Sequence, residues 1–472
     1  MKRRRNSKRQ EGNRVKDNVD AEIEELEGPS FANLPCEITT IILLSLPIKS
    51  VLICRCVCKS WNTLISDPYF AKLHFKTAPF GVMIRTNDPK RVSRTLHLLE
   101  YEETEKFCSS DQQFCFCEDN SLQPDCNGHL KLQPKFKLPL RDAKLVLAER
   151  DQANNGRRKR TYIACKPRVD KFAVLNSCNG LICLCDLRDI DPLVVCNPVT
   201  GEFIRLPKTT RIEDMGRPIY AGFGFHRRTN EYKVIRMRIK YIDISQDIRE
   251  WMFDCVVVQM HTLGTSTWKN IGRVALAFVN ELTFPTCVNG ALHWICSNGQ
   301  KGSILCFSFE SESFRRFPPP PQILDGNGSM SARSINMGEL RGFLYICDVS
   351  SFGLVRMWVM KKYGIEESWS KVISIDNMGE ARWPYGLYWP VQLFKGAVLL
   401  YHSCNRFIYY ESKKLTYFKI RGSKSNFEVF PHIPSLISLK DAVKGNNVEV
   451  LSVHSRCAKF KLREENEVLF FA

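Results

Sequence analysis

The chain has 472 residues, of which 44% are hydrophobic and 25% charged, so most of it is expected to fold into two or three domains. The formal net charge is +18, and residues 1–16 carry a dense group of basic side chains with Glu11 as their one acid. No apolar signal segment follows this basic start, and the nearby run Ile41–Leu44 is too short to span a membrane. These features argue against a secreted or membrane-spanning protein and predict a soluble intracellular one, in the nucleus, the cytoplasm or both.

Residues 1–30 predict a disordered basic tail, because they contain too few apolar side chains to bury a core. Lys2, Arg3, Arg4 and Arg5 form a candidate nuclear-localisation signal. A solvated tail without any such role explains the same residues equally well. Nucleic-acid binding through the tail is an alternative function, although no recognition helix, RNP-like motif or aromatic stacking platform accompanies it.

Residues 31–78 predict a small three-helix domain. Leu34-Pro35-Cys36-Glu37 opens the first helix, because proline suits the first turn and an acid suits the positive helix N-terminus. Leu46-Pro47 ends this helix, and two more are expected before Asp67-Pro68 terminates the last. The domain has more Leu, Ile, Val and Trp than so small a bundle can bury, which indicates an apolar face left open for a partner.

The twenty cysteines are expected to be free thiols that serve as small hydrophobic side chains in a reducing compartment. The tightest group is Cys108, Cys115, Cys117 and Cys126, with His129 nearby. Zinc ligands are usually paired with two to four residues between them, and these spacings do not fit. We therefore expect neither a metal nor a cofactor.

Residues 90–440 predict a β-rich domain in which a glycine precedes an apolar strand at a loose repeat. Gly180, Gly290, Gly342 and Gly396 are separated by 110, 52 and 54 residues, and a degenerate copy near Tyr232–Ile235 would halve the first interval. A period near 50 residues favours the four-stranded blades of a propeller. A β-sandwich or an irregular β-domain is the alternative.

Shorter patterns complete the β region. Asn197-Pro198-Val199-Thr200-Gly201 predicts a tight turn between two strands, since Asn-Pro starts turns and glycine tolerates positive φ. Arg157–Arg160 follows an Asn-Gly pair and looks like a basic loop tip. Residues 441–472 are expected to form a C-terminal strand or tail.

The residues from Phe31 to Ile65 resemble a plant F-box over nearly the whole motif. The departures are Ile41, where an acid is common, and Ile53-Cys54, where an Arg-Phe pair is frequent. The β region resembles the plant F-box-associated domain more loosely, and the segments that carry the likeness are Leu175–Cys183, Asn197–Gly201, Gly222–Phe225, Tyr232–Val234 and Cys287–Trp294. The fold expected from both parts is an α+β multidomain chain with a helical F-box before a propeller-like all-β domain.

This resemblance implies a non-catalytic, substrate-recognition subunit of an SCF-type ubiquitin ligase. The F-box would bind a Skp-type adaptor, which bridges to a cullin, while the β-domain captures a protein for ubiquitination and degradation. The motif positions expected to contact the adaptor or support its site are Leu34, Pro35, Ile38, Ile42, Leu43, Leu46, Pro47, Leu52, Val57 and Trp61. Leu34, Pro35, Leu46 and Pro47 are the residues that we expect to make direct contact.

The residues give no catalytic motif of their own, since the nucleophile elbow, the zinc-protease helix and the phosphate-binding loop are all missing from the sequence. His226, His261 and His293 are scattered and are expected to be ordinary strand residues. Trp383, Tyr385, Tyr388 and Trp389 form a dense aromatic run that is a candidate substrate-binding site, because rigid rings favour binding hot spots. The same rings could instead fill the core. A propeller enzyme or lectin is a further alternative that only a structure can test.

Overall fold

A computed structural model describes the N-terminal helices and most of the β region. The described residues are 34–78, 81–86, 95–100, 135–139, 146–154, 157–165, and 172–453 apart from the gaps 187–189, 191–192, 208–214, 244–250, 276–281, 284, 299–300, 325–329, 332–333, 352–353, 377–386, 395–396, 403–405, 412, 419–426 and 444–447. The basic tail, the Cys108–His129 group, Trp383 and Tyr385 lie outside them. The chain divides into two units, Met1–Leu43 and Leu44–Ala472, which are described separately.

The helical region contains α1 (Cys36–Leu44), α2 (Ile48–Cys54), α3 (Lys59–Ile65) and α4 (Pro68–Thr77). The first three correspond to the predicted helices, but the fourth was not expected. Asp67-Pro68 does end α3, yet it also starts α4, because the Asp67 carboxylate accepts hydrogen bonds from the N–H groups of Tyr69 and Phe70 and Pro68 occupies the first turn. The prediction of three helices is therefore corrected to four.

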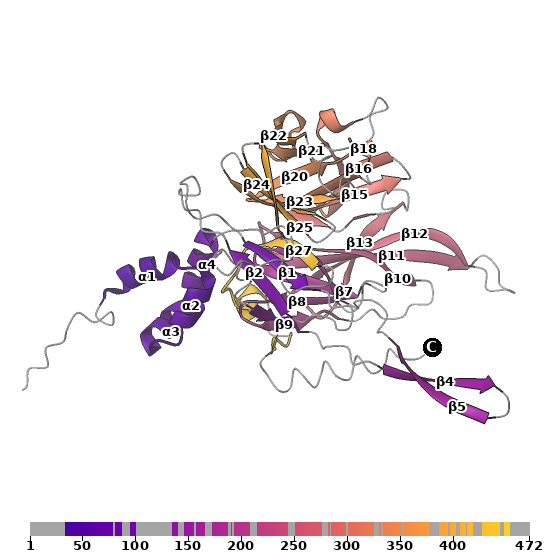
Figure 1. Ribbon diagram of the computed structural model, residues 1–472, viewed down its shortest axis with the longest axis horizontal. Helices are drawn as coiled ribbons and strands as arrows, with labels where there is room; N and C mark the ends of the chain where they lie inside the picture. Colours follow the sequence, from indigo (N-terminus) through magenta and orange to yellow (C-terminus); the bar gives the residue numbers. More distant parts are fainter. Residues whose placement is uncertain are drawn as a thin grey trace, which may run out of the picture. The chain divides into compact units, whose positions relative to one another are not determined.

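Six antiparallel sheets form the blades of a six-bladed β-propeller (Figure 1). Blade 1 contains β27 (Phe427–His432), β1 (Gly81–Thr86), β2 (Thr95–Glu100) and β3 (Lys135–Lys137). Blade 2 contains β6 (Phe172–Cys178), β7 (Leu181–Asp186), β8 (Leu193–Asn197) and β9 (Glu202–Arg205), with β28 (Leu451–Ser452) added at its outer edge. Blade 3 contains β10 (Met215–His226), β11 (Glu231–Asp243), β12 (Trp251–Thr262) and β13 (Lys269–Val274).

The other three blades follow the same four-stranded plan. Blade 4 contains β14 (Thr286–Val288), β15 (Ala291–Asn298), β16 (Lys301–Ser308) and β17 (Ser313–Phe317), with the short β18 (Met330–Ser331) beside β16. Blade 5 contains β19 (Ile335–Leu340), β20 (Phe343–Asp348), β21 (Val355–Met360) and β22 (Trp369–Ile375). Blade 6 contains β23 (Tyr388–Phe394), β24 (Ala397–His402), β25 (Arg406–Glu411) and β26 (Lys414–Phe418). Two 3₁₀ turns, Pro321–Ile323 and Glu366–Ser368, lie in the connections.

Three glycines of the predicted repeat, Gly180, Gly290 and Gly342, mark the start of the second strand in blades 2, 4 and 5, which confirms the propeller prediction, while Gly396 lies outside the described residues. Gly180 and Gly290 have φ of 77° and 72°, and the asparagine before each has φ of 46° and 51°. Two consecutive residues with positive φ form the tight hairpin turn that matches strand twist, and Asn-Gly is the pair that adopts it most readily. Gly342 turns in the same way after Arg341.

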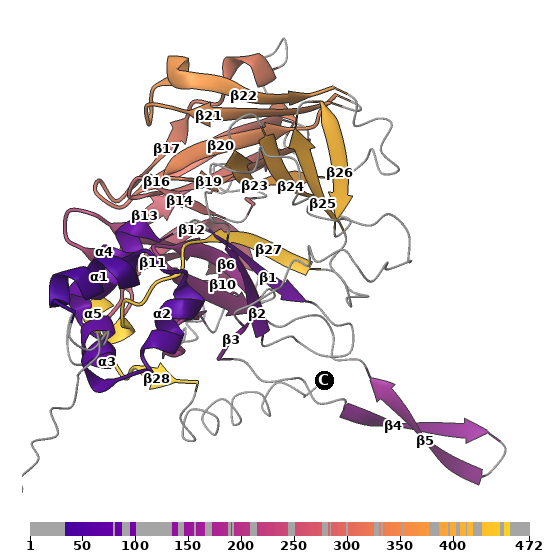
Figure 2. The same ribbon diagram turned by 60° about the vertical axis from the view of Figure 1, so that its left-hand side comes forward.

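Blade 1 joins the two ends of the β region and closes the ring. Its innermost strand, β27, pairs antiparallel with β1, so that Gly81 lies opposite His432 and Arg85 opposite Glu428. Strand β1 precedes residue 90, the expected start of the β-domain. After β27 the chain forms α5 (Leu439–Ala442) and then adds β28 to β9 of blade 2 (Figure 2).

A separate two-stranded sheet consists of β4 (Val146–Asn154) and β5 (Arg157–Cys165). In the described part of the chain neither strand pairs with a blade. Arg157–Arg160 begins β5, so the expectation of a basic loop tip is corrected: these residues lie in a strand next to the tip.

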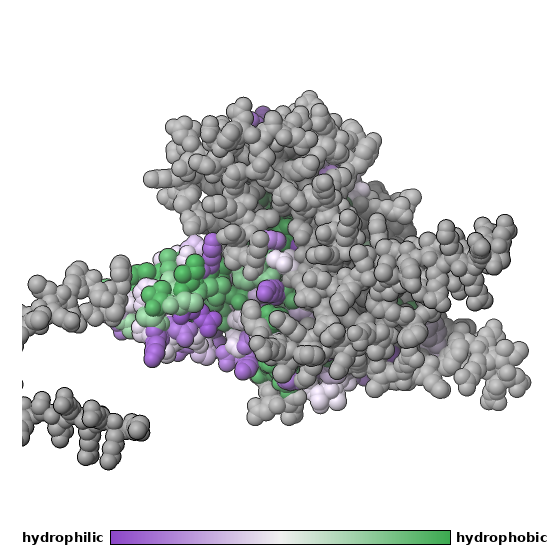
Figure 3. Space-filling model, turned by 60° about the horizontal axis from the view of Figure 1, so that its bottom comes forward, coloured by the Kyte–Doolittle hydropathy of each residue, from purple (hydrophilic) through white to green (hydrophobic). Residues whose placement is uncertain are grey.

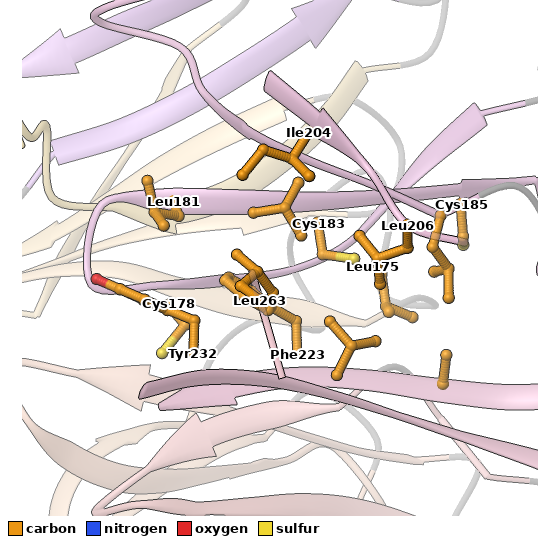
Figure 4. Packing of buried hydrophobic residues seen from close by; sticks show 14 of the residues in the cluster. Leu175, Cys178, Leu181, Cys183, Cys185, Ile204, Leu206, Phe223, Tyr232 and Leu263 are labelled. Carbon is orange, nitrogen blue, oxygen red and sulfur yellow. The ribbon is translucent and has the colours of Figure 1, made fainter. Parts of the chain in front are cut away.

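The core lies between neighbouring blades, where the side chains of facing sheets interdigitate. Between blades 2 and 3, Cys183, Leu206 and Phe223 are all at most 3% exposed, and Figure 4 shows them side by side. Every cysteine that the structure describes is a free thiol, and several of them are core residues, as the sequence predicts. Other core clusters contain residues from two neighbouring blades. Met237 and Trp294 belong to the cluster of blades 3 and 4, and Ile304 and Trp358 to that of blades 4 and 5. Tyr345 and Val398 belong to the cluster of blades 5 and 6, and Val82 and Leu399 to that of blades 1 and 6.

Candidate functional site

Helix α1 exposes an apolar face. Ile38, Ile41 and Ile42 are 45%, 64% and 38% exposed, although isoleucine is among the residues most often buried. Their spacing of three and four residues places them on one side of the helix. Leu43 is fully buried. The exposed side of α1 therefore has the composition of a protein-binding surface.

A second group of exposed apolar side chains lies on the following helices. Ile53 at the end of α2 is 58% exposed, Val57 before α3 is 61% exposed, and Tyr69 on α4 is 70% exposed. The other side of α2 is buried, since Ile48 and Val51 are both 0% exposed. The space-filling view shows a hydrophobic area with hydrophilic residues along one side of it (Figure 3).

Outside the helices, the large hydrophobic side chains that are exposed among the described residues are Phe343, Ile365 and Val372 of blade 5. Exposed apolar side chains scattered over a surface are ordinary, whereas a concentration on short helices is not. The helical region is thus the strongest candidate for a docking site.

The ten motif positions expected at the adaptor site differ in exposure. Pro35, Ile38, Ile42 and Val57 are exposed, and Leu43 is buried and so supports the fold rather than presenting a contact surface. The half-buried positions are Leu34, Leu46, Pro47, Leu52 and Trp61. Adaptor contact through these residues stays a prediction.

Sequence reasoning missed the two most exposed isoleucines of the region as contact candidates. The sequence marks Ile41 and Ile53 as departures from the F-box pattern that are expected to tune the choice of adaptor, not as contact positions, yet they expose more of their surface than Ile38 or Ile42. The sequence did contain a signal for these two residues. Isoleucine at a position where a charged residue is common indicates a helix surface that is covered by a partner.

Polar side chains tie the innermost strands of neighbouring blades together. The Asn176 side chain on β6 donates to the carbonyl of Phe223 on β10 (2.7 Å) and accepts from the N–H of the same residue (3.0 Å). Glu428 on β27 accepts a hydrogen bond from the N–H of Val174 (2.7 Å) and pairs with Arg85 of β1 (2.8 Å). These side chains replace backbone partners that strands of separate sheets cannot supply.

The Gly222-Phe223-Gly224-Phe225 motif is a packing device. Phe223 is fully buried in the core between blades 2 and 3. A Cβ on Gly222 would lie 2.6 Å from Leu292, and one on Gly224 would lie 2.3 Å from the Phe309 ring. The two glycines therefore let β10 approach blade 4 closely, and this role accounts for the motif without any bound phosphate.

The turns that join first to second and third to fourth strands lie at one end of the propeller, because neighbouring strands are antiparallel. We call this end the turn rim. Polar contacts link the blades there: Arg227 donates to the Asn289 side chain (2.7 Å), and Arg228 pairs with Glu310 at 3.6 Å. The chain enters β1 and leaves β27 at this same rim.

The three histidines noted in the sequence are packed in blades 3 and 4. His293 is fully buried and bonds to the Tyr363 hydroxyl (2.8 Å) and the Thr286 carbonyl (3.3 Å). Burial lowers the pKa of His293 to about 3, so the ring stays neutral at physiological pH. Burial also lowers the pKa values of His226 and His261.

Two members of the predicted aromatic site lie in β23. Tyr388 is 2% exposed, and its ring lies against the ring of His402 in a tilted arrangement, with ring centroids 4.5 Å apart. Trp389 is half-buried and packs beside Tyr401. Both rings thus fill space in blade 6, which is the alternative that the sequence left open, and substrate contact through them stays a prediction.

Two kinds of feature are missing among the residues that the structure describes. Histidine, cysteine, aspartate and glutamate side chains nowhere gather in threes with the geometry of a metal site there. No helix in the same part of the chain has the length and apolarity needed to cross a membrane.

Comparisons with known proteins agree with the two-part architecture. The family model for the F-box associated beta propeller domain matches residues 140–439, and that for the F-box domain matches residues 31–73. F-box protein At3g07870 of Arabidopsis thaliana is 25% identical over 78% of this chain and 79% of its own length. F-box/LRR-repeat protein At2g43260 from the same plant is 26% identical over 83% and 80%, and F-box protein CPR1 is 23% identical over 86% and 89%.

Solved structures are more distant. A chain of a nidogen/laminin complex covers 62% of this chain and 97% of its own length at 9% identity, with a TM-score of 0.33. A likeness this low adds nothing to the argument, which rests on the family models and the observed blades.

Proposed function

Because the chain belongs to the plant F-box proteins that carry an F-box-associated β-propeller domain, we propose that it is the substrate-recognition subunit of an SCF-type ubiquitin ligase. The observation that carries the proposal is the exposed face of α1 formed by Ile38, Ile41 and Ile42. A partner that covers this face removes apolar surface from water. In the proposal that partner is a Skp-type adaptor, which bridges the chain to a cullin.

The exposed area supports binding of moderate strength. Full burial of an isoleucine side chain contributes roughly 1.5–3 kcal/mol, so covering the remaining surface of the three α1 residues contributes on the order of 3 kcal/mol. Ile53 on α2, Val57 before α3 and Tyr69 on α4 expose further apolar area. Association and side-chain ordering offset part of this gain.

The propeller is the part that we assign to substrate capture. In blades 2 to 6 the turn rim carries mostly short turns, such as Asn179-Gly180 and Asn289-Gly290. The strands joined by the longer connections 318–334 and 376–387 end and begin at the opposite rim. Loops placed by a rigid scaffold commonly carry binding function. We therefore assign substrate contact to the rim opposite the turn rim. The protein acts there by proximity, holding a target near activated ubiquitin, and supplies no nucleophile of its own.

The adaptor-binding step is tested by mixing the purified full chain with a Skp-type adaptor and measuring affinity by titration calorimetry. Ile38→Glu and Ile41→Glu should each weaken binding by about tenfold or more, equivalent to about 1.4 kcal/mol, because a charge would be buried against the partner. Val372→Glu is the matched control, since it adds the same charge at an exposed site of blade 5. Equal affinity for all variants would remove α1 from the interface.

The substrate and the location are tested in cells. With the proteasome inhibited, affinity purification of the wild-type chain should recover bound proteins that carry ubiquitin. Purification of the Ile41→Glu variant should recover the same proteins without ubiquitin. If both recover the same unmodified proteins, the ligase proposal fails while the propeller remains a binding module. A fluorescent fusion lacking residues 2–5 tests whether Lys2, Arg3, Arg4 and Arg5 direct the protein to the nucleus rather than the cytoplasm.

A further inference from the structure

Two cysteines from separate blades meet near the turn rim. Cys178 is the last residue of β6 in blade 2, and Cys287 lies in β14 of blade 4. Their Sγ atoms are 3.3 Å apart, although 109 residues separate them in the chain. Both precede an Asn-Gly turn, so they occupy similar places in their blades.

The packing of three strands holds the two sulfur atoms at this distance. Asn176 lies two residues before Cys178 in β6. Its side chain hydrogen-bonds to the backbone of Phe223 and so fixes β6 against β10. A Cβ on Gly224 of β10 would lie 3.2 Å from the Cys287 Sγ, so the glycine leaves room for that sulfur. Figure 4 shows Cys178 at the margin of the core, near Tyr232.

We propose that Cys178 and Cys287 form a reversible disulfide when the protein meets a peroxide, a modification that links blade 2 to blade 4. The sulfur atoms must move from 3.3 Å to a bond length of about 2.05 Å, a shift that side-chain rotation and small strand movements can supply. The modification goes beyond the proposed ligase role and does not depend on it.

The chemistry balances in two steps. The Cys287 thiolate attacks one oxygen of hydrogen peroxide, the O–O bond breaks, and the products after protonation are a sulfenic acid and water. The Cys178 thiol then attacks the sulfenic sulfur, the S–O bond breaks, and a second water leaves with the thiol proton. In total two thiols lose two electrons and two protons, and one peroxide is reduced to two waters.

The surroundings assign these roles. Cys287 is partly exposed, so a small oxidant reaches it first, whereas Cys178 is only 7% exposed. The hydrogen bond from Cys178 lowers the pKa of the Cys287 thiol against the opposing effect of its partial desolvation, and a backbone hydrogen bond at Phe225 adds to the lowering. The same shared proton and burial raise the pKa of Cys178. Arg227 favours a thiolate at both sulfur atoms and Glu339 opposes it.

The test treats the purified full chain with hydrogen peroxide, blocks remaining thiols with iodoacetamide, and maps the peptides by mass spectrometry. The expected product is a peptide pair joined through Cys178 and Cys287, lighter by two hydrogen atoms and separated again by dithiothreitol. Because the bond closes a loop of 109 residues, the midpoint of thermal unfolding should rise by roughly 5 °C on oxidation and fall back on reduction.

Variants separate the two roles. Cys178→Ala should leave Cys287 as a sulfenic acid that dimedone traps, while Cys287→Ala should give neither dimedone adduct nor cross-link at this site. Cys196→Ala, which removes another buried thiol of blade 2, is the control and should behave as wild type. The proposal is overturned if the joined peptide is missing when the exposed Cys36 and Cys56 are already oxidised, or if Cys178 and Cys287 pair with other cysteines instead.

Discussion

Asn197 joins blade 2 to the segment that follows the last blade strand, and its replacement tests how that segment is held. The side chain is fully buried and makes four hydrogen bonds. Its Nδ2 donates to the carbonyls of Ser435 (2.9 Å) and Ile437 (2.8 Å), while Oδ1 accepts from the N–H groups of Val199 (2.9 Å) and Thr200 (3.4 Å). One amide therefore shapes its own turn and anchors a segment more than 230 residues away.

Asn197→Ala should lower the free energy of unfolding by about 3 kcal/mol. A hydrogen bond contributes roughly 1 kcal/mol net, and a buried group left without its partner costs about 1–3 kcal/mol, so losing two donated and two accepted bonds supports this magnitude. Urea-induced unfolding measures the change. Asn270→Ala, at an exposed position of β13, is the control and should change the free energy by less than about 0.5 kcal/mol.

Asn197→Asp separates the two roles of the side chain. An aspartate can still accept from Val199 and Thr200, but it presents a second oxygen to the carbonyls of Ser435 and Ile437 where the amide donated. If the turn alone mattered, this variant would be nearly as stable as wild type, because aspartate suits such turns. We expect it to be at least as unstable as Asn197→Ala at neutral pH and to release the segment after β27 to proteases. Wild-type stability in Asn197→Asp would refute the reasoning.

Two further predictions concern packing and pH. Gly224→Ala should lower the free energy of unfolding in urea by about 1–3 kcal/mol, because the added Cβ would lie 2.3 Å from the Phe309 ring. Combining Gly224→Ala with Phe309→Leu should recover part of this loss. If the effects of the two substitutions simply add, the predicted contact is contradicted. The folded-state pKa of His293 is about 3, below the unfolded value near 6.5, so the unfolded state binds more protons between these pH values and stability falls as the pH drops through that range. Between pH 7 and pH 5 the free energy of unfolding of the wild-type protein in urea should fall by about 2 kcal/mol more than that of His293→Gln. An equal pH dependence in the two proteins would count against the lowered pKa of His293.

The propeller could be predicted from sequence because its repeating turns are local. Asn179-Gly180 and Asn289-Gly290 encode a positive-φ hairpin in adjacent residues, so a reader of the sequence finds the second strand of each blade without knowing the fold. Blade 1 escaped the same reading. Its second strand does begin at a glycine, Gly81, but its first strand is β27, which comes from the other end of the domain. Ring closure is a long-range event that no local pattern records.

The helical region shows a different limit. The sequence predicts that Asp67-Pro68 ends a helix, yet the same two residues also have the features of a helix start, with an acid at the N-cap and proline in the first turn. Sequence alone cannot rank the two interpretations when both apply. Exposure was equally hard to infer, because Leu43 and Ile42 are adjacent apolar residues and only the fold decides that the first is buried and the second is 38% exposed.

The residues in the β region that carry the family likeness are those that build the propeller. The likeness therefore predicts the fold, and it does not predict which protein the domain binds. Asn176 ties two blades, Asn197 anchors the closing segment, and Gly224 lets two strands approach. Each of these roles depends on contacts within the domain, so these residues serve the fold whatever protein the domain binds. On the proposed function, the choice of substrate then depends on the connections at the rim opposite these turns. Exchanging the connection 318–334 for that of a relative should therefore change the captured protein and leave adaptor affinity unaltered, whereas a change in adaptor affinity alone would place substrate choice elsewhere.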